Sequence, residues 1–255
     1  MLTQSDIEAG LRSLGVQPGM MLEVHSSLRA FGYVQGGANT VIHALQSTIG
    51  TQGAIVMPAF RLSRKLPLTQ DDSNLGITLK IRFLRDDETS SDMGLIADTF
   101  RPMPGICEGE GHFRVAAWGN DARLHASAGF QRIIDYGGYA LLLGVNIYRL
   151  SAMHYVEDAI PADIKARFVP SAEARARYPA DEWFIESFAP AAKPWYEIQA
   201  QAYAAGLITE GMIGDCKCMF FPVQPVVELY QQALQTRPHK LFGLEKDDAH
   251  TPHLG

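Results

Sequence analysis

The sequence predicts a layered α/β fold, in which helices pack on a sheet. Short apolar runs alternate with segments of helical periodicity through the first half of the chain, which is the pattern of α/β layer proteins. With 47% hydrophobic and 20% charged residues, the chain of 255 residues has the composition of a folded globule and is long enough for one sizeable core. No repeat and no linker is visible in the sequence, so we expect a single domain over residues 1–255.

The first expected elements form a strand–helix–strand unit. Met21–Ser26 is an apolar run that predicts a buried strand. Gly36–Gly37 then precede Ala38–Ile49, whose apolar residues fall at helical spacing. Ala54–Phe60 is the next expected strand, and Pro58 should lie at its end because proline cannot donate to a central ladder.

The middle of the chain is less regular. Residues 61–91 are polar and irregular, which predicts a long loop or flap. A helix is expected over residues 92–101, because prolines follow it. Phe113–Trp118 and Tyr139–Val145 have the composition of strands.

The last third is expected to be mainly helical. The pattern becomes helical after Ser151, and Ala162–Ala191 is charged and poorly periodic. Helices are expected at Trp195–Ala204 and Val223–Gln235. The polar tail Glu245–Gly255 should be loosely attached.

The charge balance argues against several classes of partner. Lys plus Arg number 22 and Asp plus Glu number 28, giving a net charge of −6. Such a balance disfavours generic binding to nucleic acid or to an anionic membrane surface. We therefore expect no nucleic-acid partner and no membrane partner, and a negative surface would favour a cationic small molecule.

Cysteine usage and the N-terminus indicate the compartment. The three cysteines, Cys107, Cys216 and Cys218, are too few for a disulfide framework and complete no zinc motif. The N-terminus lacks a basic region followed by an apolar one, and apolar runs are far shorter than the roughly 20 residues that span a bilayer. We expect free thiols and a cytoplasmic protein.

The most informative motif follows the apolar strand that ends at Gly144–Val145. Ser151 is placed to cap a helix, which puts His154 in its first turn and Glu157 one turn later on the same face. The positive end of the helix would disfavour protonation of His154 and keep it a neutral base. Glu157 could orient the imidazole or bind a cation. Two alternatives are a capped helix with a solvated His–Glu pair, and half of a metal site without an evident third ligand; we expect no metal.

A second motif lies where the first strand ends. Ser26, Ser27 and Leu28 offer hydroxyls and amides, Arg29 can face a phosphate, and Gly36–Gly37 follow. Phosphate or pantetheine oxygens suit such a junction, although an ordinary tight turn would read the same way. The sequence contains no P-loop, no G-x-S-x-G elbow and no strand followed by G-x-G-x-x-G.

Taken in order, these stretches resemble the aminoglycoside 3-N-acetyltransferases, also called antibiotic N-acetyltransferases. The likeness runs from Gly19 to about Gly243 and includes VHSSLRAFG, VQGGANTVIHALQSTIGTQGAIVMPAF, GLIADTFRPMPG, VAAWG, GYALLLGV, SAMHYVE and GLITEGMIGDCKC. The resemblance implies a single three-layer α/β domain, whose central mixed sheet is covered by helices. It also implies transfer of an acetyl group from acetyl-CoA to an amine of a small aminocyclitol antibiotic, and it allows a homodimer.

The resemblance also implies roles for individual residues. His154 and Glu157 match the family's Thr-x-x-His-x-x-Glu segment, with Ser151 in place of Thr, so His154 would be the general base. The loop and turn that help hold CoA in the family match a set of residues in this chain: His25, Ser26, Ser27, Leu28, Gly36, Gly37, Met57 and Pro58. Apart from the resemblance, acidic residues of the segment 157–192 would line an acceptor pocket for a polyamine, although each taken singly also fits a solvated charged surface. They are Glu157, Asp158, Asp181, Glu182 and Glu186.

One segment departs from the family pattern. Cys107–Arg114 stands where the family carries Arg-Ser-x-His-Pro-x-x-Ser, and His112 could supply the missing histidine. If this segment lies beside the reacting centre, Glu108 and Glu110 would repel CoA unless they are paired or face the acceptor. We therefore expect Glu110 and His112 to contact the acceptor, and the acceptor to differ from common aminoglycosides.

The expected reaction is direct attack of a primary amine on the acetyl-CoA thioester, with His154 as base and backbone amides near Ser26–Leu28 as oxyanion donors. Three alternatives remain open. The same fold could act on another natural-product or sugar amine with a CoA or carrier-protein thioester, it could be a non-catalytic ligand-binding descendant, or it could be a metal-dependent hydrolase.

Overall fold

A mixed seven-stranded sheet forms the centre of the protein. The computed structural model describes residues 1–190 and 194–244, so the expected tail 245–255 lies outside the described residues. The strand order is β4-β5-β2-β1-β6-β9-β8. β1 runs parallel to β2 and β6, and the other pairings in this sheet are antiparallel. The strands are β1 (Met21–Ser26), β2 (Ala54–Pro58), β4 (Cys107–Glu108), β5 (Val115–Gly119), β6 (Tyr139–Leu143), β8 (Thr209–Ile213) and β9 (Cys216–Pro222).

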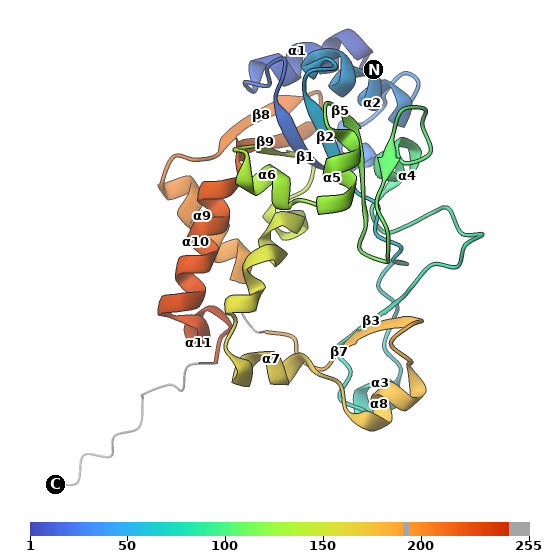
Figure 1. Ribbon diagram of the computed structural model, residues 1–255, viewed down its shortest axis with the longest axis vertical. Helices are drawn as coiled ribbons and strands as arrows, with labels where there is room; N and C mark the ends of the chain where they lie inside the picture. Colours follow the sequence, from blue (N-terminus) through green and yellow to red (C-terminus); the bar gives the residue numbers. More distant parts are fainter. Residues whose placement is uncertain (191–193, 245–255) are drawn as a thin grey trace, which may run out of the picture.

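Helices cover both faces of the sheet, which gives the three-layer α/β fold expected (Figure 1). One core lies under α1 (Gln4–Ser13), α2 (Ala38–Ile49) and α4 (Leu95–Phe100). The other lies under α5 (Ala122–Ala128), α6 (Gln131–Asp135), α9 (Pro194–Ala204) and α10 (Val223–Thr236). Alternate residues of β1 enter opposite cores, because successive side chains of a strand point to opposite faces.

Local signals explain the elements that the sequence predicts well. Thr3 and Asp6 form a capping box at the start of α1. Helix α2 lies between Gly37 and Gly50, which both have positive φ, a conformation that glycine adopts without strain. Pro58 ends β2, where it pairs with Val115 of β5. The expected strand Met21–Ser26 and helix Ala38–Ile49 are confirmed at both ends.

The expectation of a loop over residues 61–91 is wrong, because this segment contributes to a small lobe. A two-stranded antiparallel sheet pairs β3 (Leu79–Arg82) with β7 (Trp183–Glu186). Helices α3 (Gln70–Asn74) and α8 (Ala172–Arg177) complete the lobe, which lies below the main sheet in Figure 1. The two strands are about a hundred residues apart in sequence, so no local pattern reveals their pairing.

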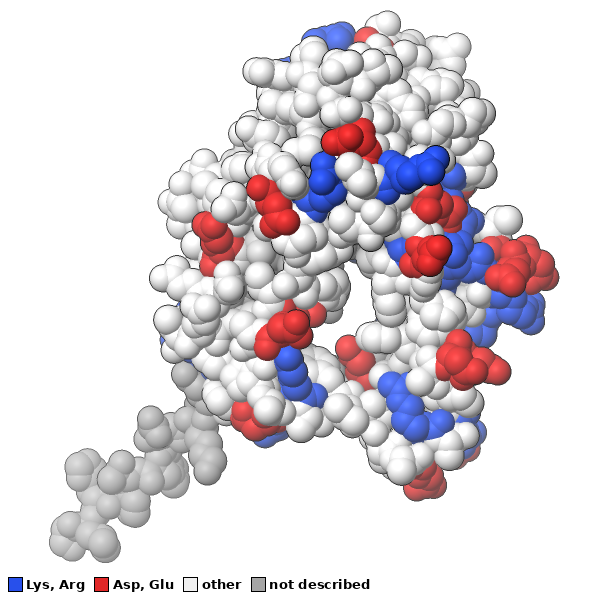
Figure 2. Space-filling view, viewed as in Figure 1, with Lys and Arg blue, Asp and Glu red and all other residues white. Residues whose placement is uncertain are grey.

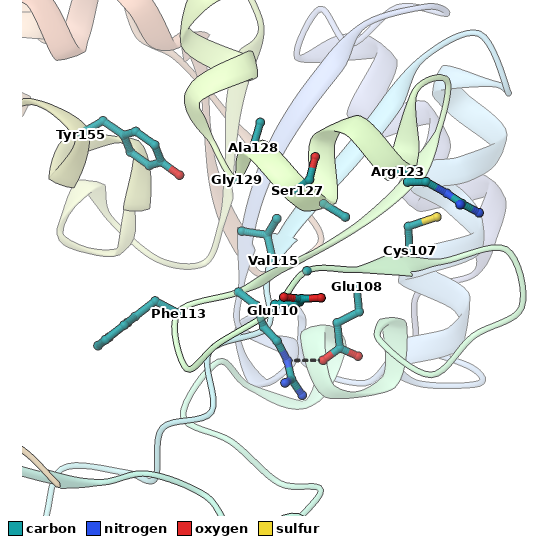
Figure 3. Close-up of a pocket in the computed structure, with 13 residues that line it drawn as sticks. Cys107, Glu108, Glu110, Phe113, Val115, Arg123, Ser127, Ala128, Gly129 and Tyr155 are labelled. Carbon is teal, nitrogen blue, oxygen red and sulfur yellow. Dashed lines mark ion pairs between the residues drawn. The ribbon is translucent and has the colours of Figure 1, made fainter. Parts of the chain in front are cut away.

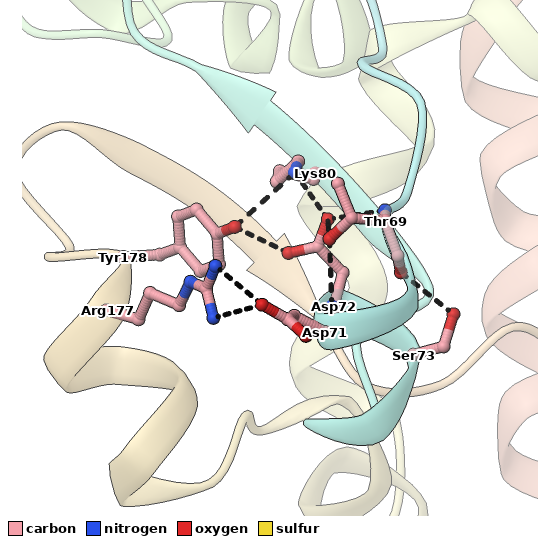
Figure 4. A network of polar contacts seen from close by, with 7 residues as sticks. All are labelled: Thr69, Asp71, Asp72, Ser73, Lys80, Arg177 and Tyr178. Carbon is pink, nitrogen blue, oxygen red and sulfur yellow. Dashed lines mark hydrogen bonds and ion pairs between the residues drawn. The ribbon is translucent and has the colours of Figure 1, made fainter.

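A buried ion pair holds the lobe together (Figure 4). Asp72 is fully buried and accepts from Lys80 Nζ at 2.5 Å and from the Tyr178 hydroxyl at 2.5 Å. Burial alone would raise the pKa of Asp72, but hydrogen bonds from Lys80, Thr69 and Tyr178 hold it well below its usual value. The apolar core around this network consists of only four buried residues, so polar contacts contribute much of the order of the lobe.

The remaining elements connect these parts. The segment after β6 contains three-residue-per-turn helices rather than α-helix, and β8 and β9 form a hairpin at the sheet edge that the sequence did not reveal. Across residues 1–190 and 194–244, no helix has both the length and the apolar character needed to cross a membrane. The short helices not yet named are η1 (Leu28–Phe31), η2 (Ile147–Arg149), η3 (Ser151–Ala159), α7 (Ala162–Phe168) and α11 (Pro238–Leu241).

We predict that Lys80→Met destabilises the lobe more than the main sheet. The substitution leaves the Asp72 carboxylate buried without its cation, which costs about 3 kcal/mol. Hydrogen exchange of the amides in residues 69–82 and 171–186 should accelerate by about a hundredfold. Lys65→Met, at an exposed lysine of the same lobe, is the matched control. Unchanged protection in Lys80→Met would show that the ion pair does not hold the lobe.

Candidate active site

The three parallel strands end at the same edge of the sheet. β1 ends at Ser26, β2 at Pro58 and β6 at Leu143. The connection from β1 to β2 runs through α2 on one face, whereas the chain reaches β6 through α5 and α6 on the other. β1 and β6 therefore form a switch point, and open α/β sheets bind ligands outside the carboxyl ends of the strands at such points.

Two buried side chains of β1 hold the start of η3 at this edge. The Glu23 carboxylate is fully buried and accepts from the Ala152 backbone N–H at 3.1 Å. The same Glu23 oxygen lies 2.7 Å from His25 Nε2, and the Ser151 backbone N–H lies 3.4 Å from that nitrogen. Glu23 thus ties the central strand directly to the helix that carries His154.

This segment corrects one expectation and adds a second role for a residue expected at the CoA site. Ser151 is the first residue of η3 rather than its N-cap, because Leu150 occupies the cap position without a side-chain hydrogen bond. His25, expected to bind CoA, is buried and its imidazole contacts Glu23. A carboxylate in the middle of a buried strand needs a polar partner, and His25 supplies it.

His154 and Glu157 lie together, as the sequence predicts. His154 Nδ1 is 2.8 Å from Glu157 Oε2, and the imidazole packs edge-on against the Trp195 ring at 4.8 Å between centroids. The surrounding protein removes part of the hydration of the His154 imidazole, whose side chain stays 56% exposed, and this opposes protonation. The bond to Glu157 and other nearby carboxylates outweigh that effect and raise the pKa of His154 above the usual 6.5. The expectation that a helix N-terminus keeps His154 neutral is therefore wrong, because the adjacent carboxylate dominates.

A further carboxylate, Glu186, reaches the same site from β7 of the lobe. Burial and the charge of Glu157 raise the pKa of Glu186 from 4.5 to about 7, against the opposing charges of His154 and Lys65. Figure 2 shows an opening between the lobe and the rest of the molecule, with acidic side chains at its margin. Two neighbouring carboxylates beside an aromatic ring suit a ligand that carries more than one positive charge.

Glu157 has an additional neighbour that the sequence did not reveal. Tyr230 of α10 is almost fully buried, and its pKa is raised by burial and by the charge and hydrogen bond of Glu157. Glu23, Trp195 and Tyr230 all support the His154 site but were not predicted. For Glu23, the signal available in the sequence was a charged residue inside the apolar run MLEVHS, since carboxylates are rarely buried unless they are paired.

The loop of Ser26–Arg29, which the sequence predicts to bind CoA, lies at the carboxyl end of β1. Ser26 and Ser27 are partly exposed and Arg29 is exposed, whereas the Ser27 N–H already donates to Leu143 O at 2.8 Å. The backbone N–H groups of Leu28 and Arg29, at the start of η1, are the remaining candidates to donate hydrogen bonds to the thioester oxyanion. Gly36 and Gly37 precede α2, and their φ angles of 78° and 63° explain why glycine stands there. Met57 and Pro58, also expected to bind CoA, are buried side chains at the end of β2.

The segment that departs from the family pattern borders a hollow of about 610 Å³ (Figure 3). Arg114 Nε lies 2.5 Å from Glu108 Oε1, so the charge of Glu108 is balanced. Glu110 is exposed at the rim, and Tyr155 lines the hollow from η3 while His154 does not. Glu108 thus meets the condition, pairing with a cation, under which no repulsion of CoA was expected.

Two other expected acceptor residues have partners outside the His154–Glu157 pair. The Asp158 side chain is fully exposed and lies 3.6 Å from Lys165 Nζ. His112 stacks on Phe83 of the lobe, with 3.9 Å between ring centroids. Within the described ranges 1–190 and 194–244, no three His, Cys, Asp or Glu side chains gather as they would around a metal ion.

We predict that Glu186→Gln stabilises the protein at alkaline pH. The raised pKa means that the folded state binds the proton more tightly than the unfolded chain. Stability is therefore lost as pH rises from 4.5 to about 7. The Gln variant lacks this loss, so its melting temperature should exceed wild type at about pH 8 and match it at about pH 4. Glu182→Gln, exposed on the same segment, is the control; equal melting temperatures at both pH values would contradict the prediction.

Comparison with known proteins identifies the family. The model of the family described as aminoglycoside 3-N-acetyltransferase matches residues 24–235. An aminoglycoside N(3)-acetyltransferase III from Serratia marcescens is 29% identical over 264 residues, which cover 89% of this chain and 95% of the relative.

Solved structures share the fold. The aminoglycoside acetyltransferase AAC(3)-IVa, as the apoenzyme, superposes with a TM-score of 0.70 at 22% identity, covering 94% of this chain and 91% of that one. A binary complex of AAC-IIIb with CoASH superposes with a TM-score of 0.64 at 19% identity, covering 96% and 99%. The chain therefore belongs to the aminoglycoside 3-N-acetyltransferase family, and it is an acetyl-CoA-dependent N-acetyltransferase.

Proposed function

We propose that this enzyme acetylates an amine of a polycationic aminoglycoside or a related amino compound, with His154 as general base. The observation that carries the proposal is the His154–Glu157 pair, which lies 2.8 Å apart at the carboxyl edge of the sheet beside a second carboxylate, Glu186. Structural neighbours have been solved with a gentamicin, with apramycin and with sisomicin. These ligands carry several amines, which fits a site that offers two carboxylates.

The geometry suggests how the proton moves. Glu157 occupies His154 Nδ1, so Nε2 is the nitrogen that receives the proton from the attacking amine. The amine nitrogen forms a bond to the thioester carbonyl carbon, and the carbon–sulfur bond then breaks. His154 returns the proton to the departing CoA sulfur, which leaves the amide and CoA thiol as products. Glu157 orients the imidazole and stabilises its protonated form, as the acidic member of a catalytic triad does.

The acceptor site distinguishes the reacting amine from the others. The reacting amine must be neutral, whereas further ammonium groups of the acceptor can pair with Glu157 and Glu186. The rings of Trp195 and Tyr148, whose centroids lie 5.7 Å apart, continue the site with apolar surface. Sugar rings pack well on such surface, because their C–H faces are apolar. A polyamine built on sugars meets both requirements.

The donor is proposed to bind along the loop after β1. Ser27, Leu28 and Arg29 begin the loop, and Gly36–Gly37 lead into α2. The N-terminus of this twelve-residue helix attracts phosphate groups through its free amides and its dipole. Acetyl-CoA is a cytoplasmic metabolite, which supports a cytoplasmic location for the reaction.

His154→Ala should abolish acetyl transfer while leaving the fold and the affinity for CoA nearly unchanged. Loss of a general base lowers kcat by about a hundredfold or more. The assay follows thiol release from acetyl-CoA with a panel of aminoglycosides and polyamines, and mass spectrometry of the acetylated amine. His239→Ala is a matched control, because His239 is also exposed and lies 2.7 Å from a carboxylate, Asp163. Near-normal turnover in His154→Ala would remove His154 from the mechanism.

Arg29→Ala should raise KM for acetyl-CoA by about tenfold, with little change in acceptor KM, because one charge-assisted bond to phosphate is lost. Arg12→Ala, which removes an exposed arginine side chain of α1, is the control. Substitution of Gly37 is less informative, since its positive φ strains any other residue. Equal KM values for acetyl-CoA in Arg29→Ala and wild type would exclude this contact.

A further inference from the structure

The sheet of the lobe has two different faces. Lys80 pairs with Ile185, and Arg82 pairs with Trp183; Ile185 and Trp183 pack in the small core of the lobe, and Lys80 bonds to Asp72. Leu79 pairs with Glu186, and Ile81 pairs with Phe184, and these residues share the opposite face. Phe184 and Glu186 therefore point the same way from β7, away from the core of the lobe.

The chain that departs from the family pattern meets this opposite face. Phe113 packs edge-on against Phe184, with 5.9 Å between ring centroids, and against Phe60 at 5.6 Å and Phe83 at 6.0 Å. The adjacent His112 stacks on Phe83. Figure 3 shows Phe113 directed away from the Glu108–Arg114 pair. The tip between β4 and β5 thus places one aromatic ring among three others.

Backbone bonds add to this junction. The Arg61 N–H donates to His112 O at 2.7 Å, and the Leu84 N–H donates to Arg61 O at 2.8 Å. The Arg61 guanidinium donates in turn to Leu84 O at 3.0 Å. These bonds join the segment around the hairpin tip to the end of β3. Phe113 and Phe184 extend the same junction to β7, on which Glu186 is only two residues from Phe184.

We propose that Phe113 is a positioning residue that acts through Phe184 to hold Glu186 in the acceptor site. The inference rests on the proposed role of Glu186 as an acceptor-binding carboxylate. Phe184 and Glu186 lie on one face of a short strand, so a shift of the β7 backbone at Phe184 moves the Glu186 carboxylate as well. The segment that replaces the family motif thereby sets acceptor affinity without touching the reacting atoms.

The test is a double-mutant cycle on steady-state kinetics with the acceptor found in the amine panel. Phe113→Ala should raise acceptor KM by about five- to tenfold, the size expected for loss of aromatic pairs, with kcat and KM for acetyl-CoA unchanged. Phe184→Ala should raise acceptor KM by a similar factor. Phe113→Tyr, which keeps the aromatic ring, should retain the wild-type acceptor KM. In the Glu186→Gln background, Phe113→Ala should have no further effect.

The cycle separates the inference from the proposed function. If Glu186→Gln raises acceptor KM but the effect of Phe113→Ala is fully additive, Phe113 acts independently of Glu186 and the inference is overturned. If Glu186→Gln leaves acceptor KM unchanged, the proposed role of Glu186 fails, and the inference fails with it. Tyr136→Ala removes another exposed aromatic ring, at the end of α6, and should change none of these constants. Circular dichroism and melting temperature verify that each variant is folded.

Discussion

The geometry of the site depends on the hydrogen bond from the Ala152 N–H of η3 to the buried side chain of Glu23. A carboxyl group buried in a central strand loses its hydration and needs partners in the protein. Glu23 Oε2 has no hydrogen-bond partner among the described residues, whereas Oε1 bonds to His25 and to the Ala152 N–H. That second bond joins β1 to η3, two segments far apart in sequence. His154 follows Ala152 by two residues, so its backbone position is set by a side chain of the central strand.

The acid–base groups of the site are coupled, and the repulsion between Glu157 and Glu186 works against stability. Glu157 raises the pKa of both His154 and Glu186, for opposite physical reasons. It attracts the proton to the imidazole by direct pairing, and it repels a second negative charge on Glu186. A bound polycation relieves the repulsion between Glu157 and Glu186. With the acceptor bound as proposed above, the unfavourable arrangement of the free enzyme would become favourable, a pattern that functional sites often show.

The segment Cys107–Arg114, which departs from the family pattern, packs against the lobe. In place of the family motif, this chain carries Glu108, which pairs with Arg114, and His112 and Phe113, which contact the lobe. The lobe orders itself through the Asp72–Lys80 pair on one face and docks through Phe184 on the other. On the proposal made above, changes in the hairpin would alter acceptor choice without altering His154.

The sequence by itself determined the elements whose signals are local: β1, α2 with its flanking glycines, and the pairing of His154 with Glu157, which a three-residue spacing already brings together. Tertiary structure decided what depends on distant partners. The pairing of β3 with β7 joins strands about a hundred residues apart, so polar residues 61–91 resembled a loop. The distant carboxylates Glu23 and Glu186, which add to the raised pKa of His154, likewise reach it only through folding, because charge interactions depend on separation in space and not along the chain.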